Sequence, residues 1–405
     1  MISASPTVTK VLGGQLCSGC GLCAGLAPDA FEMRASSPGY ARPRAIGPVS
    51  PKAERAIAIS CPGSIVAPWH DAPERDANWG PYHQITTGYA RDPVTRHAGS
   101  SGGMVSALAM HALRQGLVQA VAHIVADNEM PTRNMLKWST TEHEIRAGAG
   151  SRYAASSPLA NIDIALSSGT RFAFIGKPCD VSALRQLATV DERVGRQVPI
   201  MLSFFCGGIP SYAGTGRIID AMGLAIEDVA EFRYRGDGWP GLTRAVTNDG
   251  RVGEMRYADS WGRHLSKEVQ FRCKICPDAV GGVADIACAD AWYGGESGYP
   301  TFDEMDGRSL VITRTVVGAD LLSSAVNVGT IQVEPLPVAE IALMQPAQAR
   351  RKRLIASRLA ACVLTLQPRP KMAGLDVALA SRNTALMDRL KNMLGTMRRI
   401  LVDQR

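Results

Sequence analysis

The sequence predicts an α/β protein, with a small cysteine-rich module before the main domain and a helical tail after it. A chain of 405 residues suffices for two or three domains at roughly 100–200 residues each. Its composition, 46% hydrophobic and 20% charged, is that of a globular protein and excludes disordered, collagen-like and coiled-coil classes. From about residue 85, short apolar strand patterns alternate with helical patterns, which is typical of helices layered on one sheet.

The chain divides by composition into three parts. Residues 1–70 carry four cysteines and many turn-forming residues, which predicts a loop-rich module held by metal, and residues 71–84 form a polar, proline-containing linker. Residues 85–335 are predicted to be the α/β domain, and residues 336–405 the helical tail.

Within the α/β domain, apolar runs bounded by turn residues predict each element. The first unit is a strand, a Ser/Gly turn, a helix and a second strand at 85–90, 99–103, 103–115 and 118–125. Later strands at 171–176 and 198–205 are each followed by a helix, the second running over 212–222. Asp249-Gly250 predicts a hairpin between 243–248 and 251–257, and SLVITR, VGADLLSSAVNVG and TIQVEP predict a final strand, helix and strand.

The positive charge lies mainly in the tail. The net charge is +7, but residues 346–405 hold 13 Lys or Arg and three acids, so the rest of the chain is slightly acidic and no nucleic-acid partner is expected. Apolar residues at helical spacing predict amphipathic helices there. Two interpretations stay open: a capping helix pair with a solvated basic face, or a dock for an acidic partner such as a ferredoxin or an anionic membrane surface.

No run of about 18 apolar residues predicts a transmembrane segment, and the N-terminus lacks the layout of a secretory signal. We therefore expect a cytoplasmic protein whose ten cysteines are thiols.

The first cysteine set favours a [4Fe–4S] cluster. Cys17, Cys20 and Cys23 form C-S-G-C-G-L-C, and Cys61 precedes a proline, which is the ligand pattern of ferredoxins and predicts a ferredoxin-like module. Zinc would normally use two separated pairs and fits this spacing poorly, and unmetallated thiols are the third possibility.

The second set is dispersed. Cys179 and Cys206 each end a predicted strand, and Cys273 and Cys276 form a C-x-x-C loop. Because ends of adjacent parallel strands meet at one crevice, these four cysteines are candidates for another cluster, against buried structural cysteines with a small zinc or thiol pair. Cys288 is a rival ligand in an apolar strand pattern, and a helical apolar pattern places Cys362 in the core.

The turn H-A-G-S-S-G-G-M-V at 97–105 joins a strand to a helix. Amides at a helix N-terminus attract a phosphate or a flavin's polar edge, whereas the alternative is a serine N-cap. The segments 150–153 and 233–241 combine Arg, aromatic residues and glycines, which suits an anion clamp or a surface loop.

These motifs together resemble the coenzyme F420 hydrogenase/dehydrogenase beta-subunit family, which includes hydroxymethyl-chlorophyll reductase and ferredoxin-dependent divinyl-chlorophyllide reductases. The resemblance covers roughly residues 15–315 and is carried, in order, by C-S-G-C-G-L-C, S-S-G-G-M-V-S-A-L, S-R-Y, F-I-G-K-P-C-D, F-F-C-G-G-I-P-S, R-Y-R-G-D-G-W-P-G, S-W-G, C-K-I-C-P-D and A-D-I-A-C-A-D-A-W.

The resemblance implies an FAD-dependent enzyme with two [4Fe–4S] clusters. By the family's pattern the second cluster's ligands are Cys179, Cys206, Cys273 and Cys276. The residues implied to lie at the flavin are Ser100, Ser101, Gly102, Gly103, Met104, Arg152, Tyr153 and Lys177. The chain departs from the family's pattern at three points: Gly207 stands where the family commonly has a histidine, Lys177 where it has a threonine, and Ala289 where it has a glycine.

A flavin beside clusters converts one-electron into two-electron transfer. The expected function is an oxidoreductase moving electrons between ferredoxin or reduced deazaflavin F420 and a small organic acceptor. The alternatives are a non-catalytic electron-transfer subunit of a hydrogenase or dehydrogenase, with a partner subunit or a homo-oligomer as its assembly, and a zinc-stabilised binding protein. Lys177 is a candidate to stabilise a reduced flavin, and His97 and Asp290 are candidate acids without an assigned role.

Overall fold

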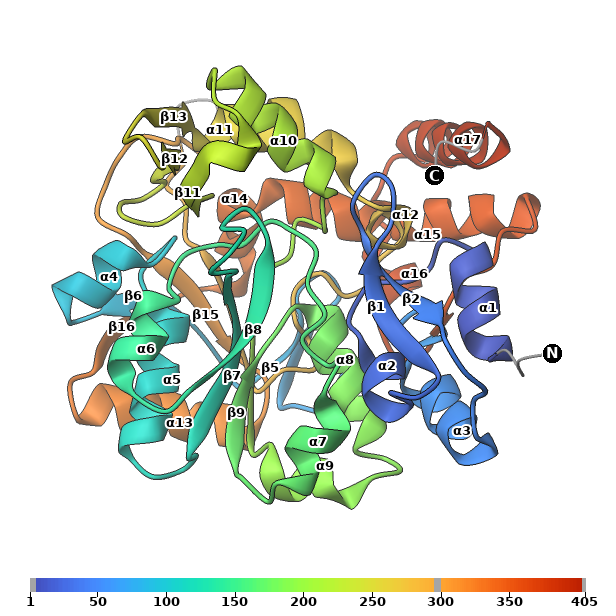
Figure 1. Ribbon diagram of the computed structural model, residues 1–405, viewed down its shortest axis with the longest axis horizontal. Coiled ribbons are helices and arrows are strands. Elements are labelled where there is room, and N and C mark those ends of the chain that lie inside the picture. Colours follow the sequence, from blue (N-terminus) through green and yellow to red (C-terminus); the bar gives the residue numbers. More distant parts are fainter. Residues whose placement is uncertain (1–4, 295–299, 403–405) are drawn as a thin grey trace.

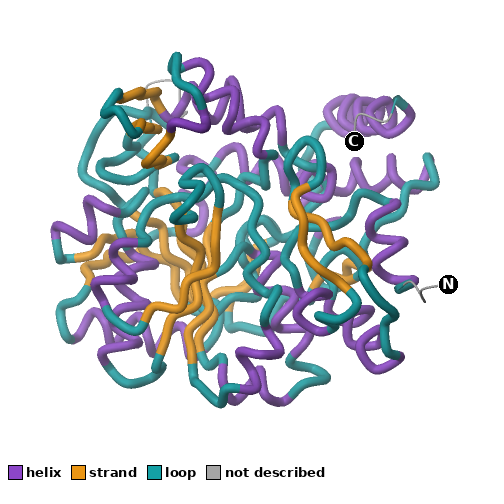
Figure 2. The backbone as a smooth tube through the Cα atoms, viewed as in Figure 1, coloured by secondary structure: helices purple, strands orange, loops and turns teal. Residues whose placement is uncertain are grey.

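The computed structural model describes residues 5–294 and 300–402, and an eight-stranded sheet lies at its centre with helices on both faces (Figures 1 and 2). In spatial order the strands are β16 (Ile331–Pro335), β6 (Gln84–Ala90), β15 (Ser309–Thr313), β14 (Ile286–Asp290), β10 (Ile200–Phe204), β9 (Phe172–Ile175), β7 (Ala120–Ala126) and β8 (Asn134–Ser139).

The sheet is mixed. Strands β7, β9, β10 and β14 run parallel at its centre, whereas β8 on one side and β15, β6 and β16 on the other pair antiparallel with their neighbours. The α/β class is thus confirmed in its coarse form. Because β9 and β10 are parallel neighbours, the loops that follow them leave the same edge of the sheet.

The two faces of the sheet have separate cores. On β9, Phe172 and Phe174 pack toward α8 (Pro178–Leu187) and α9 (Glu192–Gln197), and Ala173 packs toward α5 (Met104–Arg114) and α13 (Val316–Asn327). This alternation with both faces buried is what a central parallel strand requires. The helices α4 (Pro93–Ala98), α6 (Glu142–Ala147) and α7 (Ile162–Ser167) fill the connections.

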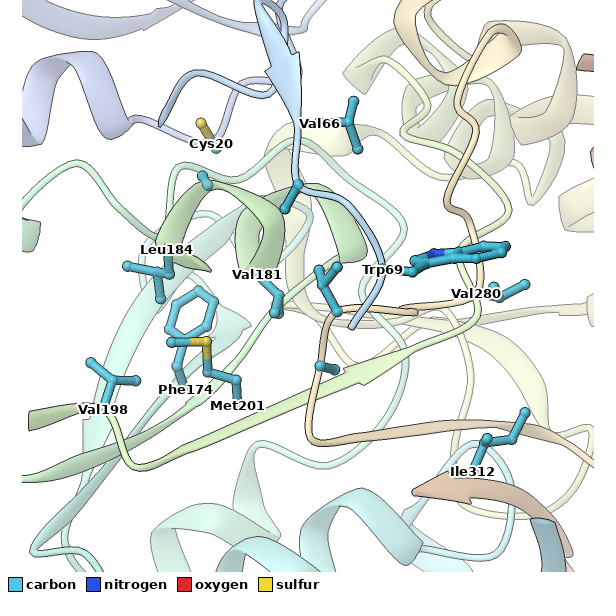
Figure 3. Close-up of a cluster of buried hydrophobic side chains, with 14 of the residues drawn as sticks. Cys20, Val66, Trp69, Phe174, Val181, Leu184, Val198, Met201, Val280 and Ile312 are labelled. Atoms are coloured by element: carbon cyan, nitrogen blue, oxygen red, sulfur yellow. The ribbon is translucent and has the colours of Figure 1, made fainter. Parts of the chain in front are cut away.

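The N-terminal segment packs directly onto this domain. It contains α1 (Pro6–Gly13), α2 (Leu22–Leu26), the hairpin β1 (Phe31–Ala35) and β2 (Ala41–Ala45), α3 (Pro51–Ser60) and β3 (Ile65–Val66). Cys20, Val66 and Trp69 share one buried cluster with Val181 of α8 and Phe174 of β9 (Figure 3).

Residues 71–84, expected to be a polar linker, instead form a short ordered hairpin of β4 (Glu74–Asp76) and β5 (Gly80–Tyr82). The reason is Trp79, which is buried and stacks on Phe205 with ring centroids 5.8 Å apart. A buried aromatic side chain ties the segment to the domain in spite of its polar composition.

A second, three-stranded antiparallel sheet stands beside α10 (Tyr212–Ala221). It is formed by β11 (Val229–Arg233), β12 (Leu242–Thr247) and β13 (Val252–Arg256), and the hairpin predicted at Asp249-Gly250 is confirmed between the last two. The connections are η1 (Ile226–Asp228), α11 (Tyr257–Asp259), η2 (Ser260–His264), η3 (Leu265–Glu268) and α12 (Phe271–Lys274).

The tail is helical, as predicted, and α15 is partly buried. Its elements are η4 (Val338–Glu340), α14 (Ile341–Met344), α15 (Pro346–Leu364), β17 (Lys371–Met372), α16 (Val377–Ala380) and α17 (Leu386–Leu401). Leu354 and Ile355 of α15 are buried, and β17 pairs in parallel with β3 of the N-terminal segment. Within the described part of the chain, no helix has the length and apolar character that a membrane crossing requires.

Candidate functional site

The first cysteine set comes from two places in the chain: Cys17 and Cys20 lie between α1 and α2, Cys23 lies in α2, and Cys61 follows α3. Gly19 and Gly21 both adopt left-handed backbone with φ of +79° and +85°. A side chain on Gly21 would come 2.8 Å from the backbone nitrogen of Ala160, so the close wrapping of this loop requires glycine.

The four thiols of this set lie close enough to influence one another. Burial raises the pKa of Cys23, and Cys17, Cys20 and Cys61 raise it further. The Gly19 amide donates a hydrogen bond to Cys17 Sγ at 3.4 Å. Without a bound metal, buried thiols that raise one another's pKa stay protonated. Iron would bind the same groups as thiolates.

The second set gathers at the edge where β9 and β10 end. Cys179 lies in the first turn of α8, Cys206 follows β10, and Cys273 and Cys276 lie in and after α12. All four line one cavity of about 20 Å³. The four cysteines, which the sequence analysis grouped as candidates for one site, are therefore neighbours in the fold. Cys288, the rival candidate, does not line this cavity.

Hydrogen bonds hold the second set in place. The Ile209 amide donates to Cys273 Sγ at 3.4 Å, and burial, followed by Cys273, raises the pKa of Cys206 to about 12. Arg351 of α15 donates to the backbone oxygens of Cys206 (2.8 Å) and of Cys273. The tail therefore joins the two loops that carry these cysteines.

No three His, Cys, Asp or Glu side chains among residues 5–294 and 300–402 form a group that could hold a metal ion. In a four-iron cluster each thiolate binds a different iron, so its ligands surround a cage instead of converging on one point. Four cysteines that line one small cavity from three different segments follow the second arrangement.

A pocket of about 500 Å³ opens beside the second cysteine set, a size within the usual range for cofactor sites. Seven of the eight residues predicted at the flavin line it: Ser100, Ser101, Gly103, Met104, Arg152, Tyr153 and Lys177. Gly102 does not, because its amide is directed to the sheet and donates to Ser309 Oγ at 2.9 Å. Cys206 lines both this pocket and the small cavity.

The Ser/Gly turn does not work as a serine N-cap. Helix α5 begins after Gly103, which has φ of +71°, and no side chain caps it. Ser100 Oγ instead hydrogen-bonds to Ser151 Oγ at 2.6 Å, and Ser101 Oγ to Ser309 Oγ at 2.8 Å. Both serines fix the turn against neighbouring loops at the pocket wall.

Arg152 is a structural clamp. Its guanidinium donates to Asn134 Oδ1 at 2.9 Å and to three backbone oxygens, those of Phe232, Pro131 and Arg133. These bonds occupy all three of its nitrogens, so Arg152 shapes the pocket by joining two loops.

Lys177 provides a buried cation between the pocket and the second cysteine set. Its Nζ lies 2.7 Å from Asp180 Oδ2 and 2.9 Å from Ser156 Oγ. Burial alone would lower its pKa, but the Asp180 carboxylate, with Cys179 and Cys206, raises the pKa above the ordinary lysine value. The ammonium group therefore stays charged.

Arg235 is a site residue that sequence reasoning did not single out, although its segment was noted. It is buried, pairs with Asp290, and donates to the backbone oxygen of Ser100. Its guanidinium carbon lies 4.3 Å from the centroid of Tyr257 and 5.1 Å from that of Trp292. The sequence signal that could have identified Arg235 is the combination of arginine, glycines and aromatic residues in the segment 233–241.

The candidate acids lie differently from expectation. His97 does not line the pocket, and Asp290 lines it but is bound to Arg235. A second histidine, His123, lines it unexpectedly and bonds to Ser139 Oγ at 2.8 Å. Burial lowers the pKa of His123 to about 4, so its ring is neutral at pH 7.

Comparison with known families identifies two adjacent matches. Residues 85–162 match the N-terminal model, and residues 169–338 the C-terminal model, of the coenzyme F420 hydrogenase/dehydrogenase beta subunit.

Individual relatives agree with this match. The chain is 23% identical over 291 residues to the coenzyme F420 hydrogenase subunit beta of Methanothermobacter thermautotrophicus, covering 70% of this chain and 95% of the relative. It is 24% identical over 246 residues to the chloroplastic 7-hydroxymethyl chlorophyll a reductase of Oryza sativa subsp. japonica, covering 60% and 50%. A chain of the F420-reducing [NiFe] hydrogenase complex from Methanosarcina barkeri shares the fold, with a TM-score of 0.56 at 20% identity, covering 74% of this chain and 98% of that one.

Proposed function

Because the chain belongs to the coenzyme F420 hydrogenase/dehydrogenase beta-subunit family, we propose that it is an FAD-dependent iron–sulfur oxidoreductase. It would move electrons between a carrier, ferredoxin or reduced deazaflavin, and a small organic acceptor. The predicted units remain part of this proposal: a ferredoxin-like module over residues 1–70, the flavin and second cluster domain over 85–335, and the tail over 336–405.

One observation carries the proposal: Cys206 lines both the cavity of the second cysteine set and the large pocket. A group held by these cysteines and a planar cofactor in the pocket would therefore both lie next to Cys206. Electron transfer between a one-electron and a two-electron centre needs such proximity.

The fit of the cysteines supports two [4Fe–4S] clusters. Eight buried or half-buried thiols form two groups, one closed by glycine-dependent turns and the other around an internal cavity. We assign Cys17, Cys20, Cys23 and Cys61 to the first cluster and Cys179, Cys206, Cys273 and Cys276 to the second. Such clusters, when bound, supply one-electron transfer at potentials that hydrogen bonds to sulfur adjust.

The pocket suits a flavin through its walls. The turn from Ser100 to Gly103 contributes backbone at one wall, and the rings of Tyr257 and Trp292 stack 6.1 Å apart at another. A bound flavin would supply the exchange between one and two electrons. Lys177 holds a positive charge at the pocket, where it would favour an anionic reduced ring.

Anaerobic purification with analysis of iron, acid-labile sulfide and flavin tests this proposal. We expect about eight irons and one FAD per chain, and about half of the iron after Cys17→Ser or Cys273→Ser, because each set would hold four irons. Cys362→Ala is the matched control, since Cys362 is buried in the helix core and should leave iron unchanged. Zinc in place of iron, or unchanged iron in both serine variants, would refute the assignment.

The alternative function is an electron-transfer subunit without its own substrate. It is favoured by the relatives named as hydrogenase subunits, one of which the match covers almost completely. A stable complex with a catalytic subunit, together with no turnover by the isolated loaded chain, would support the alternative.

A further inference from the structure

The tail is bonded to the loop of the second cysteine set. Arg358 of α15 donates to the backbone oxygen of Lys274, inside the C-x-x-C loop, at 2.6 Å, and to Asn392 Oδ1 of α17 at 2.9 Å. Arg351, two turns earlier, donates to the backbone oxygens of Cys206 and Cys273. Figure 1 shows α15 and α17 side by side next to α12, and the two helices are in extensive contact.

These elements place five cations together without acidic partners. We define the basic face as Lys274, Arg350, Arg351, Arg358 and Arg399, none of which forms an ion pair with another described residue. The pKa of Arg358 is lowered to about 10, first by burial and then by Arg351, Arg399 and Arg350. Its neighbours therefore create a positive potential, and the acidic side chain that acts on Lys274, Glu268, is itself paired with Arg217.

Exposed apolar side chains lie on the other side of α17, opposite Arg399 and Asn392 by the helical spacing. Leu386, Met387, Leu390 and Leu394 are each at least 39% exposed. Charged residues such as the five cations orient an acidic protein partner as it docks. An amphipathic basic helix can also lie on an anionic membrane, so the location of the cations must decide between the two partners.

The location favours a redox partner. Two of the five cations bond to the backbone of the loops that carry the second cysteine set, so a protein on this face comes within one residue layer of Cys273. Membrane attachment would have no need of this placement.

We propose that the basic face is the docking surface for an acidic one-electron carrier protein, which exchanges electrons with the second cysteine set. This inference rests on the proposed function and adds the place of electron entry, with four of the five cations in the segment beyond residue 338, where the family match ends. Each reduced carrier gives up one electron and leaves oxidised. Two carriers that dock in turn deliver two electrons, which with two protons from water reduce one molecule of a two-electron acceptor.

Stopped-flow reduction of the loaded protein tests the proposal with two reductants. The probes are a purified acidic ferredoxin and a small viologen dye, which needs no docking surface, and the variant is Arg350→Glu with Arg399→Glu. We expect the ratio of ferredoxin to dye rate constants to fall by about tenfold or more, and the wild-type ferredoxin rate to decline with salt. The control, Arg171→Glu, changes an exposed arginine before β9 and should leave the ratio unchanged.

A ratio that the double variant does not change overturns the docking proposal, even with full iron and flavin. Binding of the wild type to phosphatidylserine vesicles that the double variant loses, with unchanged ferredoxin kinetics, also overturns it and assigns the surface to a membrane. Protein without iron or flavin refutes the proposed function itself, so the two failures are distinguishable.

Discussion

Arg235 and Asp290 form a two-pronged ion pair in the wall of the large pocket, with Nη1 3.0 Å from Oδ2 and Nη2 2.9 Å from Oδ1. Trp239 Nε1 donates to the same carboxylate at 2.8 Å. Since Arg235 also bonds to the backbone oxygen of Ser100, the pair joins β14, the loop before β12 and the Ser/Gly turn.

Replacing Asp290 should therefore destabilise the fold. In Asp290→Asn the buried guanidinium loses its counter-charge, and we expect the free energy of unfolding to fall by about 3–5 kcal/mol. Urea denaturation of the purified protein measures this difference. Asp320→Asn, on the exposed side of α13, is the control and should change stability by less than about 0.5 kcal/mol. Equal effects of both variants would contradict the structural importance of the pair.

Lys177 should set the potential of the proposed flavin. We expect Lys177→Met to lower the two-electron potential by tens of millivolts, because losing a favourable charge interaction of about 1.4 kcal/mol corresponds to roughly 30 mV. Spectroelectrochemical titration measures the potential, and Lys177→Arg, which keeps the charge, should stay closer to wild type. An unchanged potential in the methionine variant would exclude this electrostatic role.

Arg351 should help to retain the proposed second cluster. Arg351→Met removes the hydrogen bonds to the backbone oxygens of Cys206 and Cys273. In the presence of a chelator, we expect the variant to release iron faster than the wild type, and the fast phase to account for up to half of the total iron. Arg353→Met on the same helix is the matched control, because Arg353 is exposed. Iron loss at the same rate in both variants would show that the positive charge of α15, and not the hydrogen bonds of Arg351, controls the retention of iron.

His123 should make the protein sensitive to mild acid. Its pKa is about 4 in the folded protein, because of burial, and about 6.5 in the unfolded chain, so only the unfolded chain binds a proton between these values. Stability should fall as pH decreases from about 6.5 to 4, by about 3 kcal/mol in total, and level off below.

Denaturant titrations at several pH values measure this dependence. His123→Gln should flatten the curve in that window, whereas the exposed His143→Gln should not. A wild-type curve that is already flat between pH 6.5 and 4 would contradict the assignment.

Much of the sheet could be predicted because its central strands are short apolar runs between turns, and the Asp249-Gly250 hairpin followed from local turn chemistry. Helices α4 and α6 were missed since their sequences lack apolar periodicity. Asp92 caps the first, and a capping box of Thr141 and Glu144 begins the second.

The site could be predicted only in part, because its decisive contacts join distant segments. Strand-end logic associated Cys179 with Cys206, but the clamp formed by Arg152 and the pairing of Arg235 with Asp290 depend on loops that no local pattern aligns. The same holds for Arg351, whose bonds to the cysteine loops cross more than 70 residues of sequence.

The pairing of β17 with β3, together with Arg351, has a consequence for biosynthesis. Translation runs from the N-terminus, so all eight thiols of the two sets leave the ribosome before α15 and β17 exist to fasten the loops around them. The nascent chain thus presents loosely held, oxidisable thiols during synthesis, and the proposed clusters would gain the support of α15 and β17 only once the C-terminal segment has folded.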